Sequence, residues 1–280
     1  MNHSTSKAKM IAITQSLYRM DDTTDVCDGL VEAYARYKLG DVKVRHRFLK
    51  KLACLVITKL GHELRCDPST WVIATPATTE LALDFADLLQ MLLKSDTQIP
   101  VQIVGPDPCP GSDYTDCSQQ QRDSIVSSFY DFKADLTGRR LLIIDDLINT
   151  GTALAELSRR LVESGVLLSK VYPFAFVRAD FKAPQREAQL VRSVINRMTL
   201  DEILSILADP GHYLTSATML KYLSGRTRNE LTAIAAALPL NSLGKLQLGL
   251  TRYYGGHAIP EHMHLLLQGP TEQQLLRGAR

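Results

Sequence analysis

The stretch Leu141-Leu142-Ile143-Ile144-Asp145-Asp146-Leu147-Ile148-Asn149-Thr150-Gly151-Thr152 decides the fold class of this chain. Its short aliphatic run, which follows a turn at Gly138, is typical of a strand buried on both faces of a parallel sheet. Apolar residues then recur at helical spacing, at Ala153, Leu154, Leu157, Leu161 and Val162. The stretch therefore predicts a buried strand that leads through two carboxylates and a sharp turn into a helix.

The predicted turn has the chemistry of a phosphate site. Backbone N–H groups of Asn149 to Thr152 would lie at a helix N-terminus, where the helix dipole and the Thr hydroxyls favour an anion. Asp145 and Asp146 come at the carboxyl end of the strand, the edge at which open α/β sheets bind ligands. Paired carboxylates can accept hydrogen bonds from vicinal sugar hydroxyls or help to hold a divalent cation. The sequence thus predicts sugar and phosphate recognition side by side.

The stretch resembles the signature with which type I phosphoribosyltransferases bind 5-phosphoribosyl-1-pyrophosphate (PRPP). That signature has an apolar strand, two acidic residues, two apolar residues, any residue and then Thr-Gly-Thr. The resemblance implies that Asp145 and Asp146 contact the ribose hydroxyls and, indirectly, Mg²⁺. It also implies that the 5′-phosphate is wrapped by Asn149, Thr150, Gly151, Thr152 and Ala153.

The resemblance implies an α/β fold, a Rossmann-like parallel sheet flanked by helices, over residues 1–190. Residues 191–280 then form a helical C-terminal region of unknown role. A structural alternative remains open, in which an ordinary buried strand precedes an N-capped helix and the carboxylates face solvent. A Walker-type nucleotide site is disfavoured because the sequence has no Gly-x-x-x-x-Gly-Lys-Ser/Thr.

A second strand–loop–helix unit precedes the signature. Trp71–Ala74 reads as a strand and Glu80–Leu93 as a helix. The resemblance implies that the loop between them contacts pyrophosphate through backbone amides. Its residues in that role are Thr75, Ala77, Thr78 and Thr79. The loop has no basic residue, although such a residue is common there in the family.

Residues 105–123 are rich in Gly, Pro and polar residues and have no periodic core. In the chains that this one resembles, a flexible hood at this place closes over the bound sugar diphosphate and excludes water. Such hoods usually supply Lys or Arg, and here Arg122 is the basic candidate. Catalysis is then modest, or the positive charge comes from elsewhere. Strands are also predicted on either side of the signature, at Val101–Val104 and Lys170–Val177.

Composition sets the broader frame. The 280 residues suit one large or two modest domains, and a hydrophobic content of 45% suffices for a core. A net charge of +2 gives no overall attraction to nucleic acid or to a membrane surface. Five cysteines without a Cys-x-x-Cys spacing favour reduced thiols over disulfides or a zinc site. We expect a soluble, cytoplasmic protein, because no signal-peptide or transmembrane pattern occurs.

Helices fill much of the remaining sequence. Thr23–Asp25 is predicted to cap a helix that Gly40 closes, and a second helix spans Val42–Leu60 with Gly61 as its stop. The basic face of that second helix is a solvated face or a phosphate- or nucleic-acid-binding patch. C-terminal helices are predicted at Thr199–Leu207, Thr215–Leu223, Thr227–Leu238 and Ser242–Leu250.

Two further patterns lie in the C-terminal region. The helices around Ser224–Thr227 have the length of a helix-turn-helix, but packed helices explain them more simply given the near-neutral charge. His257, Glu261, His262 and His264 suggest a metal site, yet Pro260 interrupts the helix that would align them. No fixed zinc-ligand spacing is met either.

The function implied by the resemblance is that of a pentosyltransferase. It would use PRPP and Mg²⁺, transfer phosphoribosyl to a nucleobase or related nitrogen nucleophile, and release pyrophosphate. Asn149 makes 6-oxopurines less suitable acceptors, because an amide cannot take the proton that an Asp takes in that branch. The alternative is a PRPP- or nucleotide-sensing regulatory protein on the same fold. A third possibility is that the C-terminal helices form an extra substrate domain for a transfer outside nucleobase salvage. A homodimer is expected from the family alone.

Overall fold

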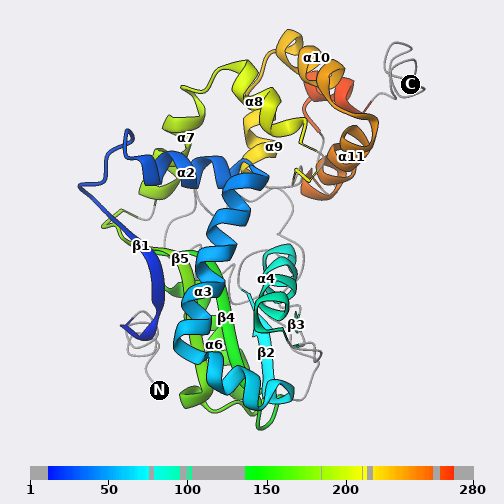
Figure 1. The fold of residues 1–280 in the computed structure, drawn as a ribbon. Coiled ribbons are helices and arrows are strands. Elements are labelled where there is room, and N and C mark those ends of the chain that lie inside the picture. The colour runs from blue at the N-terminus through cyan, green and yellow to red at the C-terminus, as the bar shows by residue number, and fades with distance from the viewer. Residues whose placement is uncertain are drawn as a thin grey trace. The chain divides into compact units, whose positions relative to one another are not determined.

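The computed structural model describes residues 12–75, 79–94, 99, 101–102, 136–183, 185–209, 211–212, 217–254 and 259–267. These residues belong to two compact units, whose helices and strands are labelled in Figure 1. The described residues of the first unit lie within 12–23, 47–102 and 136–186. The described residues of the second unit lie within 24–46 and 187–267.

A five-stranded parallel sheet forms the centre of the first unit, in the spatial order β1-β5-β4-β2-β3. Its strands are β1 (Gln15–Asp21), β2 (Trp71–Ala74), β3 (Val101–Gln102), β4 (Arg140–Ile148) and β5 (Val171–Asp180). The expected α/β fold with a parallel sheet is therefore confirmed. The predicted strand at Val101–Val104 is described only as far as Gln102.

Two strands run further than the sequence suggests. β4 continues through both carboxylates to Ile148, and β5 continues past Val177 to Asp180. Both strands extend because they pair with each other. Their parallel pairing runs from Leu141 beside Val171 to Ile148 beside Arg178. Asp145 and Asp146, which the sequence places at the carboxyl end of the strand, thus lie inside it and are followed in it by Leu147 and Ile148.

The order of the strands changes direction between β2 and β4. The chain leaves β2 through α4 (Thr79–Leu93) toward β3, whereas it leaves β4 through α6 (Thr152–Glu163) toward β5 on the other side. Parallel crossovers are right-handed, so the two helices cover opposite faces of the sheet. The loops after β2 and β4 consequently diverge. Open α/β sheets bind ligands in the crevice that such a divergence leaves.

Different helices bury the two faces of this sheet. On one face, Leu154, Leu157 and Leu161 of α6 pack with Leu141 and Ile143 of β4. On the other, Phe48 of α3 (Val42–Cys66) lies against Phe176 of β5, with 5.3 Å between the ring centroids. Apolar side chains thus cover β4 on one face of the sheet and β5 on the other.

Helix α3 does not stop at Gly61, as the sequence predicts, but continues to Cys66. Its apolar stripe carries on through Leu60 and Leu64, which are both buried. Packing of this stripe outweighs the modest helix-breaking tendency of a single Gly. The helix ends just before Asp67-Pro68, since a residue that precedes proline disfavours the helical conformation.

The described part of the second unit is helical, which confirms the predicted C-terminal helices. It contains α2 (Gly29–Lys38), α7 (Arg186–Ile195), α8 (Leu200–Leu207), α9 (Ala217–Ser224), α10 (Arg228–Ala237) and α11 (Leu240–Tyr254). A short 3₁₀ turn lies at Glu261–Leu266, and two others, Pro68–Thr70 and Leu168–Lys170, belong to the first unit. Thr199 and Thr227 begin α8 and α10 with complete capping boxes, each with a Glu three residues later. Among the described helices, none has both the length and the apolar character required to cross a membrane.

Residues of the early helix α2 belong to the second unit, although the sequence groups them with the N-terminal domain. The hydroxyl of Tyr34 donates to Glu187 Oε1 over 2.9 Å, and Lys38 Nζ lies 3.5 Å from the same carboxylate oxygen. His212 Nε2 lies 2.8 Å from the carbonyl oxygen of Leu39. The cap of α2 is Asp28, which accepts from the N–H of Leu30, rather than a residue of Thr23–Asp25.

His212 makes this unit sensitive to pH. Its ring is buried, and burial lowers its pKa although Leu39, Asp209 and Asp41 act in the opposite direction. The unfolded chain therefore binds more protons than the folded chain below the ordinary histidine pKa of 6.5. We expect the contribution of His212 to the free energy of unfolding to be complete above pH 6.5 and to decrease as the pH falls below that value.

Urea unfolding followed by circular dichroism, at pH values from about 5 to about 8, measures this effect. The variant His212→Gln keeps a side-chain N–H for the Leu39 carbonyl and cannot titrate. It should lose the part of the pH dependence that His212 causes. An unchanged slope in His212→Gln would show that other groups are responsible.

Candidate functional site

The carboxylates and the turn lie at the edge of the sheet where the strand order changes direction. β2 ends at Ala74, which pairs with Ile143, so Asp145 and Asp146 project beyond the end of β2. On its other side β4 remains paired with β5, and Asp145 lies beside Ala175. The loop after β2 begins with Thr75, whose side chain is buried. The loops after β2 and β4, which the sequence predicts to form one site, thus begin at neighbouring strands.

The structure distinguishes two carboxylates that the sequence treats alike. Successive side chains of a strand point to opposite faces, so Asp145 and Asp146 leave β4 on opposite sides. Asp145 is only 7% exposed, and its Oδ1 accepts the N–H of Asp146 over 2.8 Å. Asp146 is partly exposed. Asp146 is therefore the more accessible of the two for a ligand, while Asp145 holds the backbone next to it.

The turn after β4 leaves a helix N-terminus without a side-chain cap. Gly151 stands at the N-cap of α6 with φ 68° and ψ 9°, a left-handed conformation that favours glycine. It has no side chain that could accept from the first N–H groups of α6, and the first turn of α6 contains no acidic residue. Such an N-terminus favours an anion.

Polar side chains line the same turn. Thr150 Oγ1 and Thr152 Oγ1 lie 3.1 Å apart. The Nδ2 of Asn149 is buried and has no hydrogen-bond partner among the described residues. A buried donor without an acceptor costs about 1–3 kcal/mol, which a bound anion beside it would offset. The donor set thus fits a phosphate group.

The special backbone of Gly151 gives a testable prediction. Gly151→Ala places a Cβ on a residue with φ 68°, which should lower the free energy of unfolding by about 1–2 kcal/mol. A phosphate bound at this turn should in addition be held more weakly. Denaturant unfolding and ligand titration measure the two effects separately.

Gly138 offers a matched control, since its φ is 77° and an added Cβ would meet nothing within 4 Å. It precedes β4 and so lies at the opposite edge of the sheet. Gly138→Ala should cost similar stability and leave ligand affinity unchanged. Equal loss of affinity in both variants would mean that backbone strain, not the turn, governs binding.

The other predicted site residues are placed only in part. Thr79 opens α4, and Ala153 lies in the first turn of α6 beside the apolar cluster. Ala77, Thr78 and Arg122 lie outside the described residues, as does the whole of the predicted hood. The signature turn, in contrast, lies wholly within the described residues.

Asp145 and Asp146 are the side chains here that could help to hold Mg²⁺. No group of three or more metal-ligating residues is found in the part of the chain that the structure describes. Mg²⁺ usually binds proteins through one or two carboxylates and takes its other ligands from water and from phosphate groups of the substrate, and two neighbouring carboxylates suit that mode. In the C-terminal group, the Nε2 atoms of His262 and His264 instead face the carbonyl oxygens of Ser224 and Ile259.

Arg178 is a residue of this edge that the sequence does not single out. It lies on β5 beside Ile148 of β4 on one side and Arg19 of β1 on the other. Its Nε lies 3.4 Å from Asp180 Oδ1. The predicted strand stops at Val177, so Arg178 falls in no element of the sequence analysis. The alternating Arg178-Ala179-Asp180 that continues the strand was the available signal.

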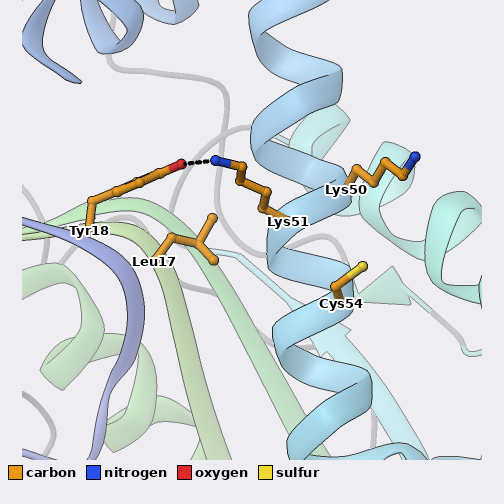
Figure 2. Close-up of a pocket in the computed structure, with 5 residues that line it drawn as sticks. All are labelled: Leu17, Tyr18, Lys50, Lys51 and Cys54. Carbon is orange, nitrogen blue, oxygen red and sulfur yellow. Dashed lines mark hydrogen bonds between the residues drawn. The ribbon is translucent and has the colours of Figure 1, made fainter. Parts of the chain in front are cut away.

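An open pocket lies between β1 and α3, away from the signature residues. It is lined by Leu17, Tyr18, Lys50, Lys51 and Cys54, as Figure 2 shows. Lys51 Nζ donates to the hydroxyl of Tyr18 over 2.6 Å and lies 5.2 Å from the centre of its ring. Lys51, on the basic face of α3, is thus hydrogen-bonded within the protein.

The comparison with known proteins points to one family. A family model described as PRTase ComF-like matches residues 11–241. The match includes β1 to β5, the signature turn and the helices as far as the start of α11. No curated protein matches the chain.

Proposed function

This chain belongs to the PRTase ComF-like family, and we propose that it binds PRPP with Mg²⁺ and transfers phosphoribosyl to a nitrogen nucleophile. The fold is that of a type I phosphoribosyltransferase. The observation that carries the proposal is the uncapped N-terminus of α6, which lies directly after Asp145 and Asp146. A phosphate at the turn and a ribose over the carboxylates are held by adjacent segments of one chain.

Each part of PRPP has a matching group. The 5′-phosphate accepts hydrogen bonds from the N–H groups at the start of α6, from the Thr150 hydroxyl and from the buried amide of Asn149. The ribose hydroxyls donate to Asp146, while Asp145 fixes the strand that carries it. The pyrophosphate lies toward the loop that begins at Thr75, because β2 is the neighbour of β4 on that side.

The proposed reaction is a displacement at C1 of the ribose. A C1–N bond forms as the C1–O bond to pyrophosphate breaks, the configuration at C1 inverts, and the nucleophile loses its N–H proton. Positive charge develops on the ribose ring, and the nearby Asp146 carboxylate stabilises it. Mg²⁺, when bound with PRPP, supplies positive charge for the leaving pyrophosphate. Asn149 cannot serve as the base, so the proton leaves to solvent or to a group outside this turn.

A PRPP-binding regulator is the second candidate. Neither the turn from Asn149 to Ala153 nor the segment from Thr75 to Thr79 contains Lys or Arg. An enzyme of this kind needs positive charge near the departing pyrophosphate, whereas a sensor only needs to bind. The helices of the second unit would then contact a partner.

Calorimetric titration with PRPP and Mg²⁺, together with an assay of pyrophosphate release over a panel of nucleobases and amines, separates these candidates. Binding with pyrophosphate release supports the transferase. Binding without release by any acceptor favours the regulator. Ribose 5-phosphate and pyrophosphate serve as controls for partial occupation of the site. No binding of PRPP by the wild-type protein would reject both candidates.

A further inference from the structure

We propose that the pocket between β1 and α3 is a second ligand site, which binds a phosphate monoester of a small organic molecule. Its lining residues are Leu17, Tyr18, Lys50, Lys51 and Cys54, and none of them belongs to the signature stretch. Such a site goes beyond phosphoribosyl transfer and does not depend on PRPP binding. Two hydrogen-bond donors held in place, the charge of the lining and the size of the pocket lead to this proposal.

Lys51 and Tyr18 bring two hydrogen-bond donors together in the pocket. Lys51 Nζ donates to the hydroxyl oxygen of Tyr18 over 2.6 Å, and an ammonium group has further N–H donors. The Tyr18 hydroxyl accepts this bond and so keeps its own O–H to donate. An anion beside them can therefore accept one hydrogen bond from the ammonium and one from the phenol. Bonds to a charged donor are the stronger kind.

Aromatic packing holds these donors in place. The ring centre of Tyr18 lies 5.9 Å from that of Phe48 on α3, and Phe48 in turn packs on Phe176 of β5. Lys51 Nζ lies 5.2 Å from the centre of the Tyr18 ring, so a cation–π contact supports the hydrogen bond. Donors that are already in position lose little freedom when a ligand binds.

The lining of the pocket is positively charged. Lys50 and Lys51 both belong to it, whereas its described residues include no carboxylate. In Figure 2 Lys50 extends away from Tyr18, and its flexible side chain can turn toward a bound anion. Glu63 is the only acidic residue in the sequence of α3, and it follows Lys51 by more than three helical turns. The pocket therefore attracts an anion.

A phosphate monoester matches the pocket in charge and in size. It carries a charge of about −1.5 to −2 at pH 7, which the two lysines can balance. Lysine is a common phosphate ligand, because its ammonium acts as a compact point charge. The pocket has a volume of about 430 Å³, which lies within the range of small-molecule sites. Its part beside Leu17 and Cys54 leaves room for the organic group of the ester.

Cys54 allows binding in this pocket to be measured directly. It is exposed and lines the pocket, so a bound ligand should protect it from alkylation by uncharged N-ethylmaleimide. Cys66 is exposed on the same helix outside the lining and serves as the control thiol. Peptide mass spectrometry follows both reactions in the presence of phenyl phosphate, phenyl sulfate or phenol. These compounds share one organic group and differ in charge.

Phenyl phosphate at about ten times its Kd should slow the alkylation of Cys54 by about tenfold and leave that of Cys66 unchanged. Phenyl sulfate, which has one negative charge, should protect less, and phenol should not protect. Lys51→Gln should raise the Kd by about tenfold or more, because it removes the charged donor. Tyr18→Phe should raise it by about three- to tenfold, since it removes the neutral donor and keeps the ring that packs on Phe48.

Two variants serve as matched controls, and both should keep the protection of Cys54. Lys59→Gln removes an exposed lysine of α3 that does not line the pocket. Gly151→Ala alters the signature turn and so separates binding in the pocket from binding there. Thermal unfolding checks that each variant folds, and Tyr18→Phe tests the site if Lys51→Gln does not fold.

Three results would overturn the proposal. One is that phenyl phosphate fails to protect Cys54 in the wild type. Another is equal protection by phenol, which would show that the pocket does not recognise the phosphate. The third is protection that persists unchanged in Lys51→Gln and Tyr18→Phe, or that is lost equally in Lys59→Gln. None of these readouts involves PRPP, so failure of the proposed transferase or regulator is detected separately.

Discussion

Replacing Asp145 and Asp146 together by asparagine should weaken PRPP binding by about a hundredfold or more. A hydrogen bond to a charged group contributes about 1.5–3 kcal/mol, so weakening the bonds of both ribose hydroxyls to Asp146 corresponds to at least two factors of ten. Calorimetric titration with PRPP and Mg²⁺ measures the change in Kd. Of the single variants, Asp146→Asn should have the larger effect, because Asp146 is partly exposed whereas Asp145 is buried against the backbone N–H of its neighbour.

Asp67→Asn is the matched control for this pair. Asp67 precedes the 3₁₀ turn Pro68–Thr70 at the start of β2 and bonds to the hydroxyl of Ser69, at the edge of the sheet opposite the carboxylates. Its replacement should leave the PRPP affinity unchanged. If the double variant binds PRPP within about threefold of the wild type, the two carboxylates do not hold the ribose.

Phe176→Ala should destabilise the first unit by about 3–5 kcal/mol. The side chain of Phe176 is fully buried and lies 5.3 Å from the ring centre of Phe48 on α3. Its truncation removes buried apolar surface and leaves a cavity that the rigid sheet cannot close. Trp71, the sole tryptophan, is buried in β2 of the same sheet, so its fluorescence reports urea unfolding of this unit.

Leu167→Ala is the control for Phe176→Ala, because it truncates an exposed apolar side chain of the same unit. Leu167 is exposed in the connection between α6 and β5, so its truncation should change the free energy of unfolding by less than about 0.5 kcal/mol. A loss below about 1 kcal/mol in Phe176→Ala would mean that α3 does not pack on β5 as described.

The local part of the site could be predicted from the sequence because its information is local. Adjacent aliphatic residues specify a buried strand, Gly151 allows the left-handed turn, and apolar spacing specifies α6. All these features lie within one short stretch. The capped helices of the C-terminal region were predictable for the same reason, since Thr199 and Thr227 each precede a Glu by three residues.

The end points of elements depended on partners distant in the sequence. β4 passes through its carboxylates only because β5 continues beside it, and α3 passes through Gly61 because its buried stripe extends to Leu64. No local pattern in the sequence indicates that β5 lies beside β4 or that this face of α3 is buried. The same holds for α2, which joins the second unit through contacts of Tyr34 and Leu39 with residues more than a hundred positions later.

The sequence by itself determined the fold class and the signature turn, with a pair of carboxylates near the end of a buried strand. Only the tertiary structure decided that these carboxylates differ in burial, and that Arg178 stands beside Ile148 on the side away from the Thr75 loop. The reason is physical. Backbone conformation and hydrophobic spacing are set by neighbours in the chain, whereas burial and the meeting of charges are set by strand order and register.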